Sequence, residues 1–593
     1  MAFDGITTHH LIKELHSDIV DGRIRKIYQP EADEIRLTIN KGRDNYNLLL
    51  SANANNPRVY LTEKPKGNPN TPPGFCMVLR KYILNGMILD IRQHQSDRVM
   101  EFHIACKNEF GDTVVRCLLV EIMGRNSNII LTDGPADGLE TPPTIMDSLK
   151  KVGSSSNRYR QILPGRPYIF PPESGRRNFF TLTEEAYVQM TADEGAVPLS
   201  KLFVQGFLGV SPILAREICF RAGVPDTASF SDLSTKQIKF LWQSFSDIRG
   251  EIQTGPLPTL YTFHRDILDF STVNLHHLVD TDEAHYPKVS AMLEDFYYLK
   301  DKKIRFTARS ANLKHQLGTL YKKSAKKLQN LRQDMQRSHS DEKSKLFGDL
   351  VTANIYQIER GMKSITVPDY NDPEMGEVTI PLKVNETPSQ NAQRFYKKYN
   401  KAKRAQIQLA DQIAITEEQT YYLDSLLNAL EQCTELAELD EIRHEFDQSE
   451  FAKKNPNQKK AAKRPEASKP MHYLSSEGFH IYVGKNNYQN DYISTRLGVD
   501  EDCWLHVKDI PGSHVLVVAD GRFITEATLL EAGMLAAWYS KARNSENVPV
   551  DYLEFKFLKK PNKSKPGMVI FTDQNTMYVT PKREAILSLT IID

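Results

Sequence analysis

The chain has 593 residues, of which 40% are hydrophobic and 25% charged, and its formal net charge is +1. A chain of this length exceeds one hydrophobic core, so roughly three to five domains are expected. No apolar run approaches the roughly 20 residues that cross a bilayer, and the near-zero net charge excludes nucleic-acid binding by bulk charge, so any such binding must come from local clusters.

The N-terminus and the cysteines predict a cytoplasmic protein. The first five residues lack the basic and apolar regions of a signal peptide. The six cysteines show neither CxxC nor metal-ligand spacing, which is typical of free thiols in a reducing compartment. We therefore expect neither disulfides nor a metal site.

Residues 1–178 are expected to form a β-rich domain with helices. Ile35, Leu37 and Ile39 alternate with polar residues, as in a half-buried strand. Residues 87–94 and 99–104 flank one predicted hairpin turn, and residues 113–123 and 128–133 flank another. Each turn carries an arginine, Arg98 or Arg125. The Pro- and Ser-rich stretch 141–172 is predicted to be a loop or domain boundary.

Residues 179–285 turn helical. Gly206 and Gly209 precede Ser211-Pro212, which predicts a helix, a glycine-containing turn, and a second helix with Ser211 as N-cap and Pro212 at its first position. This pattern is typical of a helix-hairpin-helix, although an ordinary packed helix pair would give the same pattern.

Residues 286–450 predict a long antiparallel coiled-coil arm with a small β- and turn-like insert near 364–390. Leucines at heptad spacing around Leu317 and again around Leu426 form the predicted seam. Residues 301–345 hold 13 Lys and Arg against 4 Asp and Glu, whereas residues 417–447 hold 1 against 10. Folding about the insert sets these opposite charges against each other, so interhelical pairing accounts for much of the basic run.

The basic residues nearer the insert have few acidic partners in the sequence and are better candidates for phosphate contacts: Lys343, Lys345, Lys397, Lys398, Lys401, Lys403 and Arg404. Residues 451–470 form a basic linker. Residues 471–593 form a final small α/β domain.

The densest polar motifs lie in this last domain. One is the run 483–491, and the other is the strand 503–507 with the turn after it. Alternation places Trp504, His506 and Lys508 on one strand face and an apolar set on the other. A ring, an imidazole and a cation suit stacking on bases and contacting phosphates. The candidate RNA-binding residues here are Lys485, Asn486, Asn487, Asn490, Trp504, His506, Lys508, Ser513 and His514. For Trp504, a core position is an equally good interpretation.

No Walker A, HExxH, GxSxG or dinucleotide-binding motif occurs. The sequence therefore offers no catalytic constellation, no cofactor motif and no metal ligands, and we expect a binding protein rather than an enzyme.

Several motifs together resemble the NFACT family of ribosome-quality-control proteins, in its bacterial type. The matching residues are Phe3-Asp4-Gly5, Asp97-Arg98, the run 121–128, Gly206-Phe207, Ser211-Pro212, Gly484-Lys485-Asn486-Asn487, Gln489-Asn490-Asp491, Trp504-Leu505-His506 and Pro511-Gly512-Ser513-His514. The resemblance covers nearly the whole chain. It implies an NFACT-N-like domain at 1–178 and an NFACT-R-like RNA-binding domain at 471–593.

The resemblance also implies a function. Family members bind a stalled large ribosomal subunit that carries peptidyl-tRNA, and they recruit tRNA for template-free tailing of the nascent chain. Bacterial members add alanine, which implies tRNA-Ala. The ribosome forms the peptide bond. Asp97-Arg98 is the family's characteristic tRNA-binding pair, and the implied tRNA-binding set is Asp97, Arg98, Glu121, Met123, Gly124, Arg125 and Asn128. The chain is expected to act as a monomer on the ribosome, with no membrane partner.

Two other classes remain open. The family's first two domains resemble formamidopyrimidine-type DNA glycosylases, which use an N-terminal proline and a zinc finger; here position 2 is alanine and no four-cysteine finger exists. Bacterial members also carry an older fibronectin-binding label, yet the sequence shows neither an export signal nor a wall-anchor motif.

Overall fold

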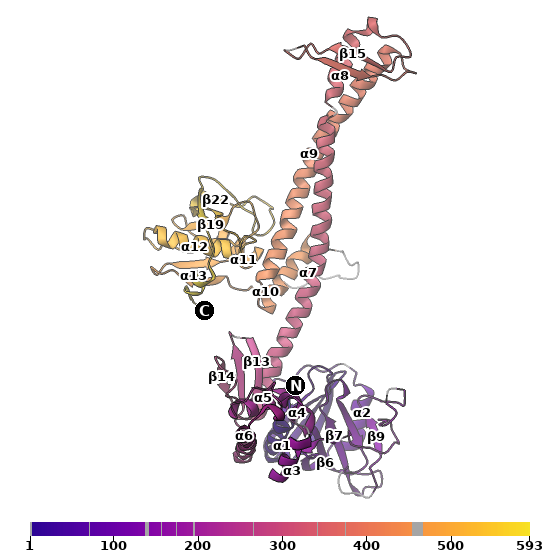
Figure 1. Cartoon of the computed structure of the whole chain (residues 1–593), viewed down its shortest axis with the longest axis vertical. Helices are drawn as coiled ribbons and strands as arrows, with labels where there is room; N and C mark the ends of the chain where they lie inside the picture. Colours follow the sequence, from indigo (N-terminus) through magenta and orange to yellow (C-terminus); the bar gives the residue numbers. More distant parts are fainter. Residues whose placement is uncertain are drawn as a thin grey trace. The chain divides into compact units, whose positions relative to one another are not determined.

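The computed structural model describes residues 3–69, 71–136, 141–155, 157–172, 175–193, 196–264, 266–340, 342–373, 375–452 and 467–592. The chain divides into two compact units, residues 1–303 and 304–593, whose elements are labelled in Figure 1. The multidomain α+β class is confirmed, because large antiparallel sheets occur together with a pair of long helices.

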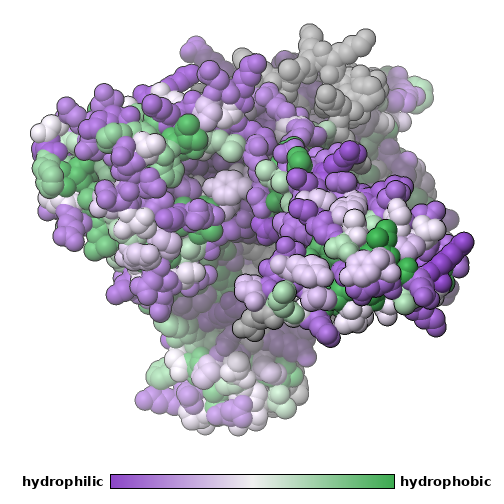
Figure 2. All heavy atoms as spheres, turned by 90° about the horizontal axis from the view of Figure 1, so that it is seen from above, coloured by the Kyte–Doolittle hydropathy of each residue, from purple (hydrophilic) through white to green (hydrophobic). Residues whose placement is uncertain are grey.

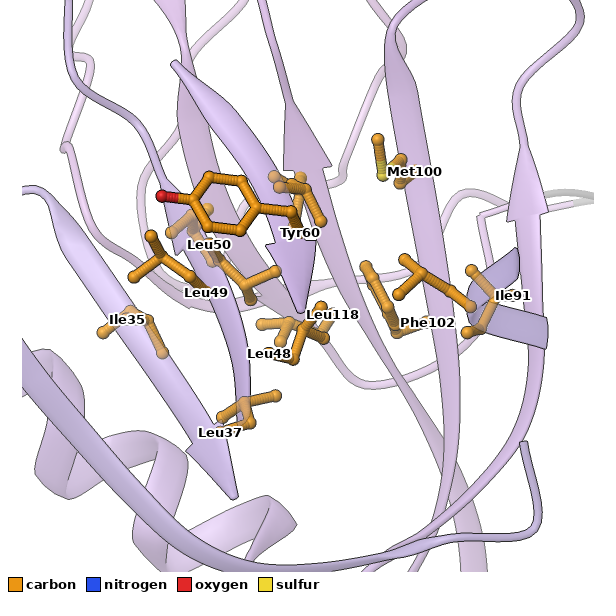
Figure 3. Packing of buried hydrophobic residues seen from close by; sticks show 14 of the residues in the cluster. Ile35, Leu37, Leu48, Leu49, Leu50, Tyr60, Ile91, Met100, Phe102 and Leu118 are labelled. Carbon is orange, nitrogen blue, oxygen red and sulfur yellow. The ribbon is translucent and has the colours of Figure 1, made fainter. Parts of the chain in front are cut away.

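The first unit is built on a nine-stranded antiparallel sheet with the order β4-β3-β2-β1-β5-β6-β7-β8-β9. Its strands are β1 (Arg23–Glu31), β2 (Glu34–Lys41), β3 (Asp44–Ser51), β4 (Arg58–Leu61), β5 (Met87–Gln93), β6 (Val99–Lys107), β7 (Thr113–Glu121), β8 (Asn128–Thr132) and β9 (Ile145–Ser148). Helices α1 (Gly5–Ile19) and α2 (Gly74–Ile83) contribute Leu11, Leu15 and Leu79 to the core of this sheet. Figure 3 shows apolar side chains of neighbouring strands packed together in this core.

Two sequence predictions in this sheet are wrong in part. Strand β2 is buried on both faces only from Glu34 to Leu37, where Glu34 pairs with Arg58 at 2.8 Å and Arg36 donates to the Lys66 carbonyl at 2.7 Å. Further along the second face, Thr38 and Asn40 are half-buried, as the alternation predicted. The predicted loop 141–172 contains strand β9, which extends the sheet. Both differences from the prediction arise from hydrogen bonds and ion pairs, which a hydropathy pattern does not report.

The helical part of this unit has a core of its own. Its elements are β10 (Arg177–Asn178), α3 (Glu184–Asp193), α4 (Leu199–Gly206), β11 (Phe207–Leu208), α5 (Pro212–Arg221), η2 (Phe230–Asp232), α6 (Thr235–Thr254), β12 (Thr259–Phe263), β13 (Asp266–Ser271) and β14 (Asp282–His285). The predicted helix–turn–helix is confirmed as α4 and α5, with Ser211 as N-cap and Pro212 at the first position. Ile6 of α1 belongs to this second core, which ties the two cores together.

The second unit contains the predicted helix pair. Helix α7 (Val289–Ser340) has 52 residues and α9 (Pro388–Gln432) has 45, or about 78 and 68 Å at the rise of an α-helix. Leu317 and Leu426 are buried in one cluster between them. The predicted interhelical charge pairing is confirmed by Lys314–Glu431 at 3.0 Å and Arg332–Glu417 at 2.7 Å.

The segment between these helices forms a small insert. It contains α8 (Lys343–Ala353), η3 (Ile355–Gln357) and the hairpin of β15 (Ser364–Pro368) and β16 (Glu377–Pro381). These elements share an apolar core that includes Val351, Ile380 and Phe395. After α9 follows the short helix α10 (Leu436–Gln448).

The C-terminal part has a seven-stranded sheet with the order β24-β21-β19-β20-β18-β17-β25. Its elements are β17 (Met471–Leu474), β18 (His480–Val483), α11 (Asn487–Tyr492), η4 (Ile493–Leu497), β19 (Cys503–Val507), β20 (Val515–Val517), α12 (Glu526–Trp538), β21 (Val548–Glu554), η5 (Phe555–Phe557), β22 (Leu558–Lys559), β23 (Ile570–Phe571), β24 (Asn575–Val579), α13 (Arg583–Leu587) and β25 (Thr590–Ile591). Strand β19 is central, so a packed layer covers each of its faces.

The surface and the cysteines give two further observations. Hydrophilic residues cover most of the face seen in Figure 2, and all six cysteines are free and buried. Within the described residues, no helix has the length and apolarity needed to cross a membrane.

Gly5 gives a sharp test of how the first unit is held together. A Cβ added there would lie 2.0 Å from the Ser96 carbonyl oxygen and 2.6 Å from the Gly209 Cα. Because both obstacles are backbone atoms, Gly5→Ala is expected to lower the free energy of unfolding by about 3 kcal/mol or more, measured by urea denaturation. The control is Gly250→Ala within α6, where nothing lies within 4 Å and a gain of about 0.5–1 kcal/mol is expected. Equal effects at the two positions would contradict this account.

Candidate nucleic-acid interface

Strand pairing brings the two arginine-bearing turns to the same edge of the sheet. Val99 at the start of β6 pairs with Glu121 at the end of β7, and the Ile122 backbone N–H donates to the Arg98 carbonyl at 2.9 Å. Residues 94–98 and 123–127 therefore lie side by side. We call these two turns the turn platform.

Asp97 and Arg98 do not form the exposed pair that the sequence suggests. Asp97 is only 4% exposed, and its Oδ1 accepts the Arg98 backbone N–H at 2.8 Å. The Gln93 amide donates to the Asp97 carbonyl and to the Gly5 carbonyl, both at 2.8 Å. The Arg98 side chain is partly exposed, at 23%. Asp97 thus organises the turn, and Arg98 is the member that can reach a ligand.

The second turn is the more open of the two. It consists of the short helix η1 (Gly124–Asn126), and Gly124 has a positive φ of 59°. The Met123 N–H donates to the Ser127 hydroxyl at 2.8 Å, which closes the turn. Met123 and Gly124 are half-buried and Arg125 is exposed. Its guanidinium is therefore accessible beside Arg98.

Glu121 and Asn128, also in the predicted tRNA-binding set, are internal. Glu121 is fully buried and accepts from Arg160 at 2.9 Å and from the Tyr168 hydroxyl at 2.7 Å. The Asn128 amide donates to the Lys150 carbonyl at 2.7 Å, and its oxygen accepts the Lys150 N–H at 2.9 Å. Both residues tie the strand ends that flank the second turn to the chain that follows β9, through Lys150, Arg160 and Tyr168.

The N-termini of helices α1 and α5 lie next to the turn platform. The Asp4 carboxylate caps α1 by accepting the Thr7 N–H at 2.8 Å, and it accepts the Ser211 hydroxyl at 2.7 Å. Burial raises the pKa of Asp4, while hydrogen bonds from Thr7 and Ser211 oppose that shift. Because Ser211 caps α5, one carboxylate joins the starts of both helices next to the platform.

Sequence reasoning missed two arginines in this region. Strand β10 pairs with β11 next to the glycine turn, which brings Arg176 to within 4.0 Å of the Asp97 carboxylate. Its side chain is 23% exposed. Arg177 pairs with Phe207 in the same ladder. The adjacent basic residues were the available signal, but their proximity to Asp97 depends on a strand pairing that the sequence pattern did not indicate.

In the C-terminal part, the polar run 484–490 faces the short helix α10 of the same unit. Lys485 forms an ion pair with Glu438, Asn486 donates to Glu441 at 2.8 Å and Asn487 donates to Glu445 at 2.9 Å. We call this run the asparagine segment. The carboxylates of α10 therefore occupy the side-chain donors of these three candidate RNA-binding residues.

Three other predicted residues are buried: Asn490, Trp504 and Ser513. Asn490 donates to the Gly512 carbonyl at 3.3 Å and accepts the His514 N–H at 3.0 Å. Ser513 donates to Gln432 of α9 at 3.2 Å. Trp504 is fully buried and donates to the Ser494 hydroxyl at 3.0 Å. Of the two interpretations that the sequence left open for Trp504, the core position is the one found, because β19 is an interior strand with a packed layer on each face.

His506 and His514 both lie against this indole: the His506 ring stacks on it with centroids 5.8 Å apart, and the His514 ring meets it edge-on at 4.9 Å. Burial lowers the pKa of both, and that of His506 falls to about 4. The Ser494 hydroxyl accepts the Trp504 indole N–H at 3.0 Å and shares a second hydrogen bond of 2.6 Å with His514 Nδ1. Lys508, just after β19, is exposed. Of the nine predicted residues in this domain, Lys508 is exposed, Lys485 and His506 are half-buried, and the other six are buried.

One buried trio in the described part of the chain could hold a metal ion. Glu101 and His103 on β6 and Cys117 on β7 place their donor atoms within 4.8 Å of one another. Among the described residues Glu101 Oε1 has no hydrogen-bond partner, and His103 Nε2 lies 3.5 Å from Glu101 Oε2. The sequence gave no spacing signal because strand pairing, which sets His103 opposite Cys117, brings the donors together.

These features define the class of protein: a multidomain α+β chain with a basic turn platform, a long helical arm and a polar C-terminal domain. Residues 4–465 match the family model of the NFACT N-terminal and middle domains. Residues 469–573 match that of the NFACT protein RNA binding domain. The chain therefore belongs to the NFACT family.

The similarity to curated relatives extends over full chains. The Rqc2 homolog RqcH of Bacillus subtilis is 37% identical over 601 residues, covering 99% of this chain and 100% of the relative. The Rqc2 homolog RqcH of Streptococcus suis is 35% identical over 592 residues, covering 100% of both.

Among solved structures, the N-terminal part of the fibronectin/fibrinogen-binding protein from Streptococcus suis is 33% identical. It covers 50% of this chain and 99% of its own, with a TM-score of 0.41. The fibrinogen binding protein from Staphylococcus aureus is 30% identical, with 50% and 99% coverage and a TM-score of 0.43.

The buried position of Asp97 leads to a test of stability. Asp97→Ala should lower the free energy of unfolding by about 1–3 kcal/mol, because it leaves the turn N–H of Arg98 without its acceptor. The matched change on the open turn, Arg125→Ala, should stay within about 0.5 kcal/mol. Urea denaturation of both variants provides the measurement. If Asp97→Ala were as mild as Arg125→Ala, the side chain would have no structural role in the turn.

Glu445 generates a pH prediction. Burial raises its pKa from 4.5 to about 7, opposed by hydrogen bonds from Asn487 and Tyr422 and assisted by Asp491 and Glu441. Between these two values the folded state binds more protons than the unfolded state, so the free energy of unfolding should fall as the pH rises from about 4.5 to about 7. The slope is at most about 1.4 kcal/mol per pH unit.

Glu445→Gln removes this titrating group and should flatten the pH dependence of urea denaturation over that interval. The exposed Glu431→Gln on α9 is the control and should leave the profile of the wild type. Identical profiles for wild type and Glu445→Gln would show that Glu445 does not hold its proton in the folded state.

Proposed function

We propose that this chain acts in ribosome-associated quality control. It binds a large ribosomal subunit that carries peptidyl-tRNA after stalling, and it recruits further tRNA for template-free extension of the nascent chain. The specific candidates are tRNA-Ala and alanine tailing, with the tail marking the chain for degradation. Family membership and the full-length similarity to proteins named RqcH support this proposal.

The observation that carries the proposal is the turn platform. Folded RNA is recognised through its shape, its phosphates and its exposed bases, and the platform offers two arginines on adjacent rigid turns. Arg98 is held at its backbone by Asp97, and Arg125 follows a glycine-supported bend. Guanidinium groups form bidentate contacts with phosphate. Met123 and Gly124 lie between them and leave room for close approach of a backbone.

The other members of the predicted tRNA set have an indirect role in this proposal. Asp97, Glu121 and Asn128 fix the two turns from below, and Arg176 adds a further cation next to Asp97. The peptide bond is formed by the ribosome, so the chain acts by positioning tRNA rather than by catalysis.

The helical arm supplies contacts to ribosomal RNA. Basic residues at its base pair with acidic residues of α9, as Lys314 does with Glu431. Nearer the insert, seven basic residues are candidates for phosphate contacts: Lys343, Lys345, Lys397, Lys398, Lys401, Lys403 and Arg404. In the C-terminal domain, we propose RNA contact through Lys508, His506 and the donors of the asparagine segment. The chain acts as a monomer on the subunit.

The test combines two arginine substitutions on the platform. Arg98→Ala with Arg125→Ala should weaken tRNA binding on the order of tenfold or more. It should also reduce the magnitude of the log-affinity against log-salt slope by roughly 0.7 to 0.9 per lost contact. Filter binding with purified tRNA at several salt concentrations gives both values. Co-sedimentation with large ribosomal subunits should persist, because the arm makes those contacts.

The control is Arg25→Ala with Arg43→Ala, which removes two exposed arginines from the same sheet and should leave tRNA binding unchanged. Equal loss in both double variants would indicate non-specific charge attraction. Failure of the wild-type chain to co-sediment with large subunits carrying peptidyl-tRNA would refute the proposed function.

A further inference from the structure

The asparagine segment presents a row of donors that suits oxyanions. Lys485, Asn486 and Asn487 are consecutive and point to one side, where each meets a different carboxylate of α10. Gln489 closes the row by donating to Ser468 at 2.6 Å. One ammonium group and two amide N–H₂ groups at neighbouring positions form a surface for several negatively charged oxygens in a line.

The occupant in this structure is one face of α10. Glu438, Glu441 and Glu445 follow the spacing i, i+3, i+7, which places them on one side of a helix. Each is 3% exposed. Three carboxylates spaced along a helix thus fill a surface to which successive phosphates of a nucleic-acid backbone could equally bind.

The charges at this contact are unbalanced. Three carboxylates face the single ammonium group of Lys485, and Asp491 lies near Glu445. Burying carboxylates in excess of cations is costly. The high pKa of Glu445, about 7, reflects that cost. This excess of buried negative charge therefore makes the contact between α10 and the asparagine segment less stable than a contact with balanced charges.

The contact also lacks a shared apolar core. The apolar side chains of α10 belong to the cluster at the base of the arm, which contains Leu439, Ile442 and Phe446. Among the described residues, this cluster is separate from the two apolar clusters of the C-terminal domain. The remaining ties are polar, such as Ser513–Gln432 and Lys565–Glu418 at 3.4 Å. Polar contacts of this kind are typical of interfaces that open and close.

We propose that the acidic face of α10 and the phosphate backbone of an RNA compete for the donors of the asparagine segment, so that RNA binds there only when α10 leaves. The proposal rests on the RNA-binding role of this domain in the proposed function. In the docked state, the carboxylates stand in for phosphates and keep the segment from binding RNA non-specifically.

The test uses the full chain with Glu438→Gln, Glu441→Gln and Glu445→Gln combined. Glutamine at position 438 removes the ion pair with Lys485, and glutamine at positions 441 and 445 gives the asparagine donors a neutral acceptor in place of a carboxylate, so docking weakens. Hydrogen exchange in residues 484–490 should accelerate. Affinity for a short fluorescein-labelled single-stranded RNA should rise on the order of tenfold if about nine in ten molecules of the wild type are docked. Adding Lys485→Ala to the triple variant should cancel this gain.

The control variant carries Glu431→Gln, Asp440→Asn and Asp447→Asn, which remove three exposed carboxylates from the same part of the arm. It should leave RNA affinity and exchange unchanged. An equal gain in the control would overturn the proposal, since it would reflect net charge alone. Faster exchange without tighter RNA binding would also overturn it, because the freed donors would then not bind RNA. Unchanged exchange in the triple variant would show that the carboxylates do not hold the segment.

Thermal melts identify a triple variant that fails to fold, in which case the single variant Glu441→Gln is used with the same readouts and a smaller expected gain. The RNA probe needs no ribosome. Loss of co-sedimentation with large subunits would therefore count against the proposed function, whereas the exchange and anisotropy data decide the competition.

Discussion

The close approach of three backbone segments holds the first unit together. The start of α1, the turn at Ser96 and the turn at Gly209 meet so tightly that a Cβ on either glycine would lie 2.0 Å from the Ser96 carbonyl oxygen. The Gly5 N–H donates to the Gly209 carbonyl at 2.8 Å across this junction. Since Asp97 follows Ser96 directly, the same junction sets the position of the turn platform.

Three polar residues in or beside the turn platform are buried: Asp97, Glu121 and Asn128. A rigid turn needs its polar backbone groups satisfied, and Asp97, Glu121 and Asn128 satisfy them or fix neighbouring loops. Preorganised side chains bind with less loss of conformational freedom. The buried polar residues and the exposed arginines are therefore two parts of one arrangement, in which the first hold the second in place.

The C-terminal domain also has buried polar residues. Several of them form hydrogen bonds with the separate helix α10 rather than with residues of their own domain. Asn490 and His514 stabilise the domain internally, whereas Asn486 and Asn487 donate to carboxylates of α10. Donors of the first kind are bonded within their own domain, whereas we propose that donors of the second kind exchange between the carboxylates of α10 and the phosphates of an RNA.

The sequence by itself determined the elements and their local chemistry. Alternating hydrophobicity and turn residues located both hairpins around Arg98 and Arg125, Ser211-Pro212 located the start of α5, and opposite charges predicted that the two arms pair. These features follow from interactions between residues near in sequence or from a simple periodic pattern. The motif resemblance likewise identified the family before any coordinates.

Only the tertiary structure decided burial and partnership. Alternation along β19 could not reveal that Trp504 is internal, because that depends on the strand being central in its sheet. Three further features depend on pairings between segments that are distant in the sequence. They are the proximity of Arg176 to Asp97, the grouping of Glu101, His103 and Cys117, and the docking of α10. Such pairings are set by the packing of the whole fold, and no local pattern encodes them.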